Sequence, residues 1–256
     1  MIINYEEFKN KKVIVTGSST GIGFHTALEF LSLGSQVIFH GNSSTDGLEE
    51  KIDSKIKNKK FKVLKSDFSN LKNVNNFMDD AINHLEGLDI LINNAGTMIG
   101  RYELDKISEN EFLEIFDLNA KSAYFATKKS MDTFKNQKRG CIVNVSTISA
   151  RTGGSAGSSA YAASKAFVSG ITRSLVSELS PYNIRINAIS PGTIDTKFHE
   201  QYSSKEKLEA TRMKIPMQRL GNAEDCVGPI IFLSSESMSG YITGQVLEIN
   251  GGQFIS

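Results

Sequence analysis

The stretch "KKVIVTGSSTGIGFHTALEFLSLG", residues 11–34, decides the predicted fold. Its first six residues include a β-branched run that predicts a strand, and apolar residues recur at helical spacing over 21–34. Gly17 lies between the two elements, and Gly21 and Gly23 open the predicted helix. Glycine permits a tight turn and the close approach of a phosphate to backbone N–H groups at a helix start. We therefore predict a turn that binds the phosphates of a dinucleotide, with the hydroxyls of Ser18 and Ser19 as further donors. The alternative is a glycine-rich loop that only turns the chain.

The same alternation of strand and helix continues along the chain. Because alternating elements need crossover connections, we expect parallel strands. We predict a single α/β domain over residues 1–256, a doubly wound Rossmann fold with about seven mostly parallel strands and helices on both faces. Ligands of such folds bind beyond the carboxyl ends of the strands. Strands are predicted at 11–16, 35–40, 61–67, 88–96, 140–146, 184–190 and 244–250, and helices at 21–34, 46–58, 70–87, 107–135 and 159–180.

Composition excludes several classes of function. Lys and Arg number 29 and Asp and Glu 28, so the net charge of +1 argues against nucleic-acid partners and a polybasic membrane surface. No apolar run approaches the roughly 20 residues of a membrane span, and the first ten residues do not have the pattern of a signal peptide. Cys141 and Cys226 are far apart and lack the spacing of metal ligands. We expect a cytoplasmic protein with reduced thiols and no metal site.

Turns after the other predicted strands supply further candidate ligands of a dinucleotide. Residues 93–96, "NNAG", end one strand with amides and small residues that leave room for a flat ligand. Asp67 ends another strand, where its carboxylate is a candidate acceptor from an adenine amine or a solvated end group. Pro191 and Gly192 turn the chain after 184–190, and the segment up to Thr196 is placed to meet a carboxamide.

Tyr161 and Lys165, in "SSAYAASKAF" (158–167), are four residues apart in a predicted helix and therefore lie on one face. An ammonium beside a phenol favours the phenolate and lowers the phenol's pKa. Taken alone, the stretch favours the other interpretation, a surface helix with two amphipathic residues.

Together these motifs, in this order, resemble the short-chain dehydrogenase/reductase family, and the likeness runs from Lys11 to the tail at 240–252. The tail resembles the 3-oxoacyl-carrier-protein reductase and glucose dehydrogenase branches. The resemblance implies that Tyr161 is the acid/base, that Lys165 lowers its pKa and binds the nicotinamide ribose, and that Asn119 holds a proton-relay water. The resemblance also implies a homotetramer, or a dimer, built from the helices at 107–135 and 159–180 and the tail.

One position departs from the family pattern. The family has two serines after the strand at 140–146, and the second polarises the substrate oxygen. Thr147 occupies that place here, with one extra residue in the following loop. Its hydroxyl donates and accepts as a serine does, so Thr147 is the fourth predicted catalytic residue, with Ser146 and Ser149 as alternatives.

The end of the second strand bears on the choice of cofactor. An NAD site usually has Asp or Glu there, whereas this chain has "FHGNSS" (39–44). Without a carboxylate a 2′-phosphate is not repelled, and His40, Asn42, Ser43 and Ser44 are candidate donors to it. We therefore predict NADP as the cofactor, with NAD as the alternative. For His40, the alternative to a phosphate contact is a plain surface residue. The predicted cofactor-binding residues are Gly17, Ser18, Ser19, Gly21, Ile22, Gly23, His40, Asn42, Ser43, Asp67, Phe68, Asn94, Ala95, Gly96, Tyr161, Lys165, Pro191, Gly192, Ile194 and Thr196.

The substrate is predicted to be a small carbonyl compound or secondary alcohol. A 3-oxoacyl thioester comes first, and a sugar, polyol or other small alcohol is the alternative; a non-catalytic protein that senses the dinucleotide is a third reading. Residues 193–215 form the expected substrate lid, whose basic residues suit an anionic substrate or a solvated helix. Lys138 and Arg139 fit a docking place for an acyl-carrier protein, but Tyr182 stands where relatives have a second arginine.

Overall fold

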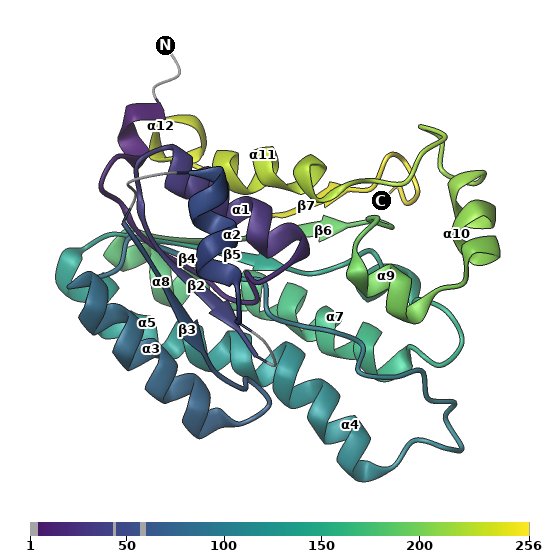
Figure 1. Ribbon diagram of the computed structural model, residues 1–256. Helices are drawn as coiled ribbons and strands as arrows, with labels where there is room; N and C mark the ends of the chain where they lie inside the picture. Colours follow the sequence, from purple (N-terminus) through teal and green to yellow (C-terminus); the bar gives the residue numbers. More distant parts are fainter. Residues whose placement is uncertain (1–4, 43–44, 57–59, 256) are drawn as a thin grey trace.

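The computed structural model describes residues 5–42, 45–56 and 60–255 (Figure 1). The described residues form a seven-stranded sheet in the order β3-β2-β1-β4-β5-β6-β7, and all of its pairings are parallel. The order reverses between β1 and β4, as in doubly wound folds. The predicted fold class is confirmed. The strands are β1 (Lys12–Val15), β2 (Gln36–Gly41), β3 (Phe61–Lys65), β4 (Ile90–Asn93), β5 (Gly140–Val145), β6 (Ile184–Pro191) and β7 (Val246–Ile249).

Helices cover both faces of this sheet (Figure 1). Successive residues of β1 point to opposite faces, as strand geometry requires. Val13 and Val15 belong to a core cluster shared with α1, α2 and α11, while Ile14 belongs to a second cluster with α3 and α5. The longer helices are α1 (Gly21–Ser32), α2 (Leu48–Lys55), α3 (Leu71–Leu85), α4 (Glu109–Phe116), α5 (Ser122–Gln137), α7 (Ser159–Ser174), α10 (Lys205–Arg212) and α11 (Ala223–Ser234), and the shorter ones are α6 (Ser149–Thr152), α8 (Val176–Leu179), α9 (Lys197–Tyr202) and α12 (Glu236–Ser239).

Two predicted helices are interrupted. The region at 107–135 contains α4, a π-helical turn at Asp117–Lys121 and then α5. The region at 159–180 is divided into α7 and α8, and a 3₁₀ turn follows at Ser180–Tyr182. Inserted π-turns are frequent at functional sites, and this one contains Asn119.

The segment predicted as a lid forms α9 and α10, which lie beside the sheet layers beyond the end of β6 (Figure 1). No helix in the described ranges combines the length and the apolar character needed to cross a membrane. The same part of the chain has no cluster of residues able to hold a metal ion, and both cysteines are buried and free.

Candidate active site

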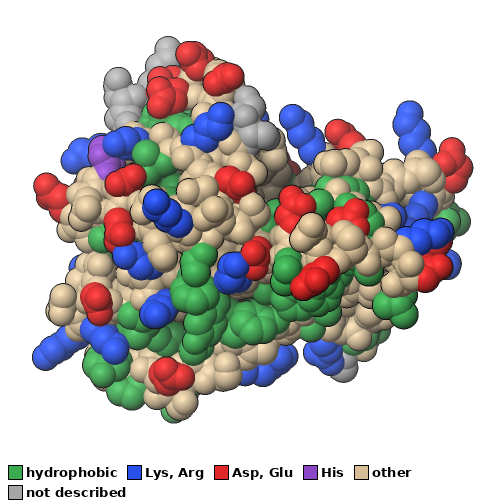
Figure 2. All heavy atoms as spheres, turned by 90° about the horizontal axis from the view of Figure 1, so that it is seen from below, with side chains coloured by type: hydrophobic (Ala, Val, Ile, Leu, Met, Phe, Trp, Pro, Cys, Tyr) green, Lys and Arg blue, Asp and Glu red, His purple; other side chains and the backbone are tan. Residues whose placement is uncertain are grey.

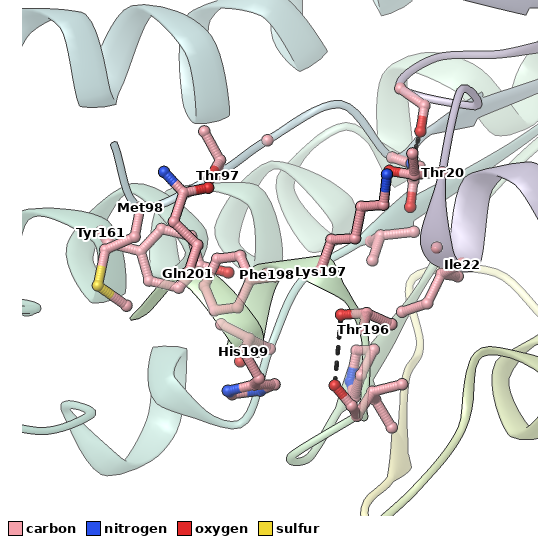
Figure 3. A pocket seen from close by; sticks show the side chains of 18 of the residues that line it. Thr20, Ile22, Thr97, Met98, Tyr161, Thr196, Lys197, Phe198, His199 and Gln201 are labelled. Carbon is pink, nitrogen blue, oxygen red and sulfur yellow. Dashed lines mark hydrogen bonds between the residues drawn. The ribbon is translucent and has the colours of Figure 1, made fainter. Parts of the chain in front are cut away.

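A cleft of about 910 Å³ opens along the carboxyl ends of the parallel strands (Figure 3). Its wall is formed by the turn after β1, the ends of β2, β4, β5 and β6, the start of α7, and the lid helices. This edge of the sheet is where a doubly wound fold binds its ligands. Most of the predicted site residues come together here although they are spread over 180 positions of sequence, from Gly17 to Thr196.

The turn after β1 has the form that a phosphate site needs. Gly17 and Gly21 have φ angles of +62° and +57°, which favour glycine. A Cβ on Gly17 would lie 2.8 Å from the Cα of Ala95, so the turn also needs glycine for space. The N-cap of α1, Thr20, makes no side-chain hydrogen bond to the helix. The first N–H groups of α1 therefore have no side-chain cap, and the residues present fit a bound phosphate.

Two residues of this turn have roles other than the predicted ones. Ser18 is fully buried; its hydroxyl donates to the carbonyl oxygen of Val15 at 2.7 Å and accepts from the N–H of His40 at 2.8 Å. The prediction that Ser18 donates to the cofactor is wrong, because its hydroxyl ties β1 to β2. Gly23 also lies behind the cleft wall, where a Cβ would be 2.4 Å from the Nδ2 of Asn94. Its small size serves packing between α1 and β4, while Ser19 and Ile22 do line the cleft.

Asn94 fixes the turn from the opposite side. Its Nδ2 donates to the carbonyl oxygens of Thr16 and Gly17 at 2.9 and 2.8 Å. The hydroxyl of Thr16 accepts in turn from the N–H groups of Asn94 and Ala95. These bonds hold the ends of β1 and β4 together, so the glycine turn and the "NNAG" segment form one rigid unit.

His40 has both ring nitrogens occupied by the protein. Its Nδ1 accepts from the N–H of Gly17 at 2.9 Å, and Nε2 lies 2.9 Å from the carbonyl oxygen of Ser66, to which it must donate. The ring stacks on Phe68, and burial lowers its pKa to about 4. The predicted role of His40 as a donor to a 2′-phosphate is therefore wrong, because the neutral ring has no free N–H.

The rest of the adenosine end differs partly from the prediction. Asn42 and Phe68 line the cleft, whereas Asp67 does not; its Oδ1 accepts from the N–H and hydroxyl of Ser69. Ser43 and Ser44 lie outside the described residues.

Two cations that sequence reasoning did not place at the cofactor also reach this wall, Lys51 from α2 and Lys197 from α9. Figure 3 shows Lys197 extended towards Thr20 at the glycine turn. Burial lowers the pKa of Lys51, and the nearby charge of Lys197 lowers it further by a smaller amount. The exposed lysines of a polar lid give no sequence signal that would separate Lys197 from its neighbours.

Lys165 and Asn119 converge on Gly96. A Cβ on Gly96 would lie 2.9 Å from the Nζ of Lys165 and 2.4 Å from the Oδ1 of Asn119. The Nδ2 of Asn119 donates to the carbonyl oxygens of Thr97 and Ile115, both at 2.8 Å, but its buried Oδ1 has no partner within the described structure. A buried acceptor without a partner fits a bound water.

Tyr161 lies one helical turn before Lys165 on α7, and its ring packs 5.7 Å from that of Phe198 on α9 (Figure 3). Burial raises the pKa of the Tyr161 phenol, and Tyr202 adds to this effect. Lys165 donates to the carbonyl oxygen of Val145 at 2.9 Å, and burial lowers its pKa to about 8. In the protein by itself, burial therefore acts against the predicted lowering of the phenol's pKa.

The three candidate hydroxyls after β5 are separated by the structure. The hydroxyl of Ser146 is buried and bonds to the carbonyl oxygen of Lys165 at 3.1 Å and to the hydroxyl of Ser169 at 2.7 Å. Ser146 therefore fixes α7 to β5 and does not face the cleft with a free proton. Thr147 and Ser149 both line the cleft, and the hydroxyl of Thr147 accepts from the N–H of Ser149 at 3.3 Å.

The turn after β6 closes the far wall. Gly192 is required for space, because a Cβ would lie 2.8 Å from the Cβ of Asn250 in the C-terminal tail. The N–H of Thr193 donates to Gln253 at 2.9 Å. These contacts position the predicted segment, of which Pro191, Gly192, Ile194 and Thr196 all line the cleft.

Comparison with known proteins agrees with this geometry. A family model described as Enoyl-(Acyl carrier protein) reductase matches residues 17–253. The chain is 34% identical over 250 residues to 3-oxoacyl-(acyl-carrier-protein) reductase FabG of Aquifex aeolicus (strain VF5), covering 97% of this chain and 99% of the relative. It is 34% identical to L-rhamnose 1-dehydrogenase (NAD(P)(+)) of Azotobacter vinelandii (strain DJ / ATCC BAA-1303), covering 96% and 98%. A solved NADH-dependent reductase A1-R′ responsible for alginate metabolism superposes with a TM-score of 0.88 at 30% identity, covering 98% and 100% of the two chains.

Proposed function

The chain belongs to the short-chain dehydrogenase/reductase family, and we propose that its cleft transfers a hydride between NADP(H) and the carbonyl carbon of a small polar substrate. The observation that carries this proposal is the convergence of Lys165 and Asn119 on Gly96, with Tyr161 one helical turn before Lys165 in the wall of the same cleft. Such an arrangement supplies an acid, a cation and a water site at one end of a cleft whose other end fits a dinucleotide. When bound, the nicotinamide supplies or accepts the hydride.

The side chains have complementary roles in this proposal. Tyr161 is protonated at neutral pH, as an ordinary phenol is, and burial raises its pKa further, so it is ready to donate to the carbonyl oxygen during reduction. Thr147 donates a second hydrogen bond to the same oxygen, where charge develops. The ammonium of Lys165 holds the nicotinamide ribose, and Asn119 holds the water through which Tyr161 regains its proton.

The proposed preference for NADP rests on charge at the adenosine end. β2 ends in Gly41, and Lys51 and Lys197 line this part of the cleft. Among the lining residues that the structure describes, Asp46 alone carries a carboxylate, just before α2. Two cations against one anion favour the additional phosphate. The relatives themselves differ in this property, since the names of two of them specify NADH and NAD(P)(+).

For the substrate, the 3-oxoacyl thioester remains a candidate because of the 34% identity to a 3-oxoacyl-(acyl-carrier-protein) reductase. The cleft argues for a smaller, more polar compound, as in the rhamnose dehydrogenase, because hydroxyl and amide groups line its substrate end. The proposed docking place at Lys138 and Arg139 does not lie at the mouth of this cleft. Both residues precede the amino end of β5, and Arg139 pairs with Asp89 at 3.2 Å. The hydroxyl and amide groups belong to Ser149, Thr152, Ser155, Ser158, Gln201 and Thr211.

The test is oxidation of NADPH in the presence of a carbonyl panel that includes a short 3-oxoacyl thioester and several keto-sugars. We expect turnover with at least one keto-sugar and a loss of about a thousandfold in Tyr161→Phe, because proton donation is removed. Binding of NADPH, followed by its fluorescence, should be retained by the variant and tighter than binding of NADH. Turnover that survives in Tyr161→Phe would contradict the proposed role of the phenol.

A further inference from the structure

The substrate end of the cleft has an excess of positive charge. Arg101, from the loop after β4, and Lys207, from α10, both line this end together with the imidazole of His199. No Asp or Glu side chain lines it within the described ranges. A cleft wall of one sign raises the local concentration of ligands of the opposite sign.

Arg101 and Lys207 converge on a single neutral oxygen. The NH1 group of Arg101 donates to the hydroxyl of Ser155 at 2.9 Å, and the Nζ of Lys207 donates to the same hydroxyl at 3.1 Å. A hydroxyl is a weak substitute for a carboxylate as partner of two cations. The described part of the chain contains no ion pair for either residue, although Arg212 on the same helix pairs with Glu209.

The position of Arg101 is fixed by its surroundings. Its Nε donates to the carbonyl oxygen of Tyr202 at 2.9 Å, and NH1 also reaches the carbonyl oxygen of Ala156 at 3.2 Å. The N–H of the next residue, Tyr102, bonds to the carbonyl oxygen of Gly157 at 3.0 Å. The guanidinium is thus held between the lid and the loop before α7, and little side-chain entropy remains to be lost when it binds a ligand.

The two cations repel each other in the protein by itself. Burial and the charge of Arg101 lower the pKa of Lys207, and burial, Arg101 and Lys207 lower that of His199, which Asp195 partly opposes. His199 is therefore neutral at pH 7 and acts as a hydrogen-bonding group; its Nδ1 lies 3.2 Å from the hydroxyl of Ser203. An anion placed beside Ser155 would relieve the repulsion between Arg101 and Lys207.

We propose that Arg101 and Lys207 bind a carboxylate of the substrate, so that the enzyme acts on a hydroxy acid or oxo acid. This inference rests on the proposed function and specifies its substrate class. The planar guanidinium suits a carboxylate geometrically, while the hydroxyl and amide groups around the cluster suit a hydroxylated carbon chain. A neutral sugar would leave both cations with only the hydroxyl of Ser155 as a shared side-chain partner.

Binding to the cofactor-loaded protein tests the inference without requiring turnover. Isothermal titration of the NADP⁺ complex would compare D-gluconate with D-glucitol, which has a CH₂OH group in place of the carboxylate, and 4-oxopentanoate with 4-oxopentanamide. We expect each acid to bind at least tenfold more tightly than its neutral partner. Arg101→Gln and Lys207→Gln should each reduce this ratio several-fold, and the double variant should bring it close to one.

Lys205→Gln is the matched control, because Lys205 is exposed on the same helix and does not line the cleft. Unchanged NADPH binding shows that each variant is folded. Equal binding of acid and neutral compound by the unaltered protein in both pairs, including no binding of either, would overturn the inference, as would a ratio that persists in the double variant.

The two proposals fail in different ways. Reduction of neutral carbonyls with no dependence on Arg101 or Lys207 would keep the oxidoreductase and remove the carboxylate site. Selective, Arg101-dependent binding of the acids without any turnover would keep the carboxylate site and contradict the proposed hydride transfer.

Discussion

Burial decides the charge of the titratable groups beside the cleft. His40 lies 2 % exposed with both nitrogens bonded, so it is neutral over the physiological range. Lys165 remains mostly charged below a pKa of about 8, and Tyr161 remains a phenol. The same residue types at exposed positions would have their ordinary pKa values, and sequence alone does not report which case applies.

The buried imidazole should make stability depend on pH. Its folded-state pKa of about 4 is below the ordinary 6.5, so its contribution is present above pH 6.5 and is lost as the pH falls towards 4. We expect His40 to account for a loss of about 3 kcal/mol in the free energy of unfolding across this window. Urea titrations between pH 7 and 4 would measure it. The loss should be much smaller in His40→Gln and unchanged in His84→Gln, whose side chain is exposed; equal losses in all three proteins would contradict the assignment.

The ammonium of Lys165 should make cofactor binding depend on pH, and here the loss should appear as the pH rises. Because its pKa is lowered to about 8, the charged form disappears above that pH. We expect the Kd for NADPH to be constant below pH 8 and to rise about tenfold per pH unit above it, as for one bound proton. Fluorescence titration from pH 6.5 to 9.5 measures this. Lys165→Arg should remove the inflection and Lys51→Gln should keep it. If Lys51→Gln removes the inflection and Lys165→Arg keeps it, the effect belongs to the other end of the cleft.

Thr147 should be distinguishable from Ser149 by substitution. Thr147→Val keeps the shape of the side chain but removes the donor to the developing oxyanion, so kcat should fall about a hundredfold. Thr147→Ser should stay within a few-fold of the unaltered enzyme. Steady-state kinetics with any accepted carbonyl gives the comparison, with Ser149→Ala measured in parallel. A larger loss in Ser149→Ala than in Thr147→Val would transfer the role to Ser149.

At the scale of elements, the strands and the glycine turn were predictable because their patterns are local. The π-turn around Asn119 was not, since "FDLNAKSAYF" is compatible with an uninterrupted helix. Helix α11 was not identified either. Its sequence is apolar on most sides and contains Gly228 and Pro229, which are typical of a turn, while a capping box of Asn222 and Asp225 stabilises its start.

Side-chain roles inside the site were the least predictable part. Ser18, His40 and Asp67 stand in sequence where a cofactor contact is expected. Hydrogen bonds within the protein use the hydroxyl of Ser18 and both ring nitrogens of His40. One carboxylate oxygen of Asp67 is likewise used, by the N–H of Ser69. A sequence shows that a polar group is near the end of a strand. It does not show whether the protein or the ligand satisfies that group, because this depends on contacts between segments far apart in the chain.

The lid should contribute to cofactor affinity through its first residue. Lys197 begins α9 and extends to the glycine turn (Figure 3), where bound phosphates would carry negative charge. We expect Lys197→Met to raise the Kd for NADPH about tenfold, an effect that shrinks at high salt. Lys214→Met is the control, since Lys214 is exposed in the same segment and does not line the cleft. Equal effects of the two substitutions would indicate only a general loss of positive charge.

At the scale of the whole molecule, exposed hydrophobic side chains gather on the side opposite α1 and α11. Seen from below, hydrophobic side chains gather in a band across the molecule (Figure 2). Phe112, Tyr124 and Phe167 are exposed by 41 %, 37 % and 41 % on α4, α5 and α7, and Tyr124 packs 6.3 Å from Phe167. Exposed apolar groups in one place are typical of an interface.

The outer face of α7 suits the close approach of a second copy. Next to Phe167 it presents Ala163, Ala166 and Gly170, all exposed, and a Cβ on Gly170 would meet no atom of the described chain within 4 Å. Gly170 is therefore not required by the chain's own packing. A helix face with small residues and one aromatic ring allows two such helices to pack tightly around the ring.

This face carries the prediction of a homo-oligomer. We expect the protein to be a tetramer or a dimer at micromolar concentration, and Phe167→Glu to shift it to a smaller species, because the substitution places a carboxylate from each copy in an apolar interface. Light scattering coupled to size-exclusion chromatography measures the mass. Tyr5→Glu is the matched control, since Tyr5 is also exposed, at 50 %, but belongs to the 3₁₀ turn Tyr5–Phe8, which lies beside α12 and away from α7 (Figure 1). A monomeric unaltered protein, or a mass that Phe167→Glu leaves unchanged, would exclude α7 as the contact and leave its outer face a solvated one.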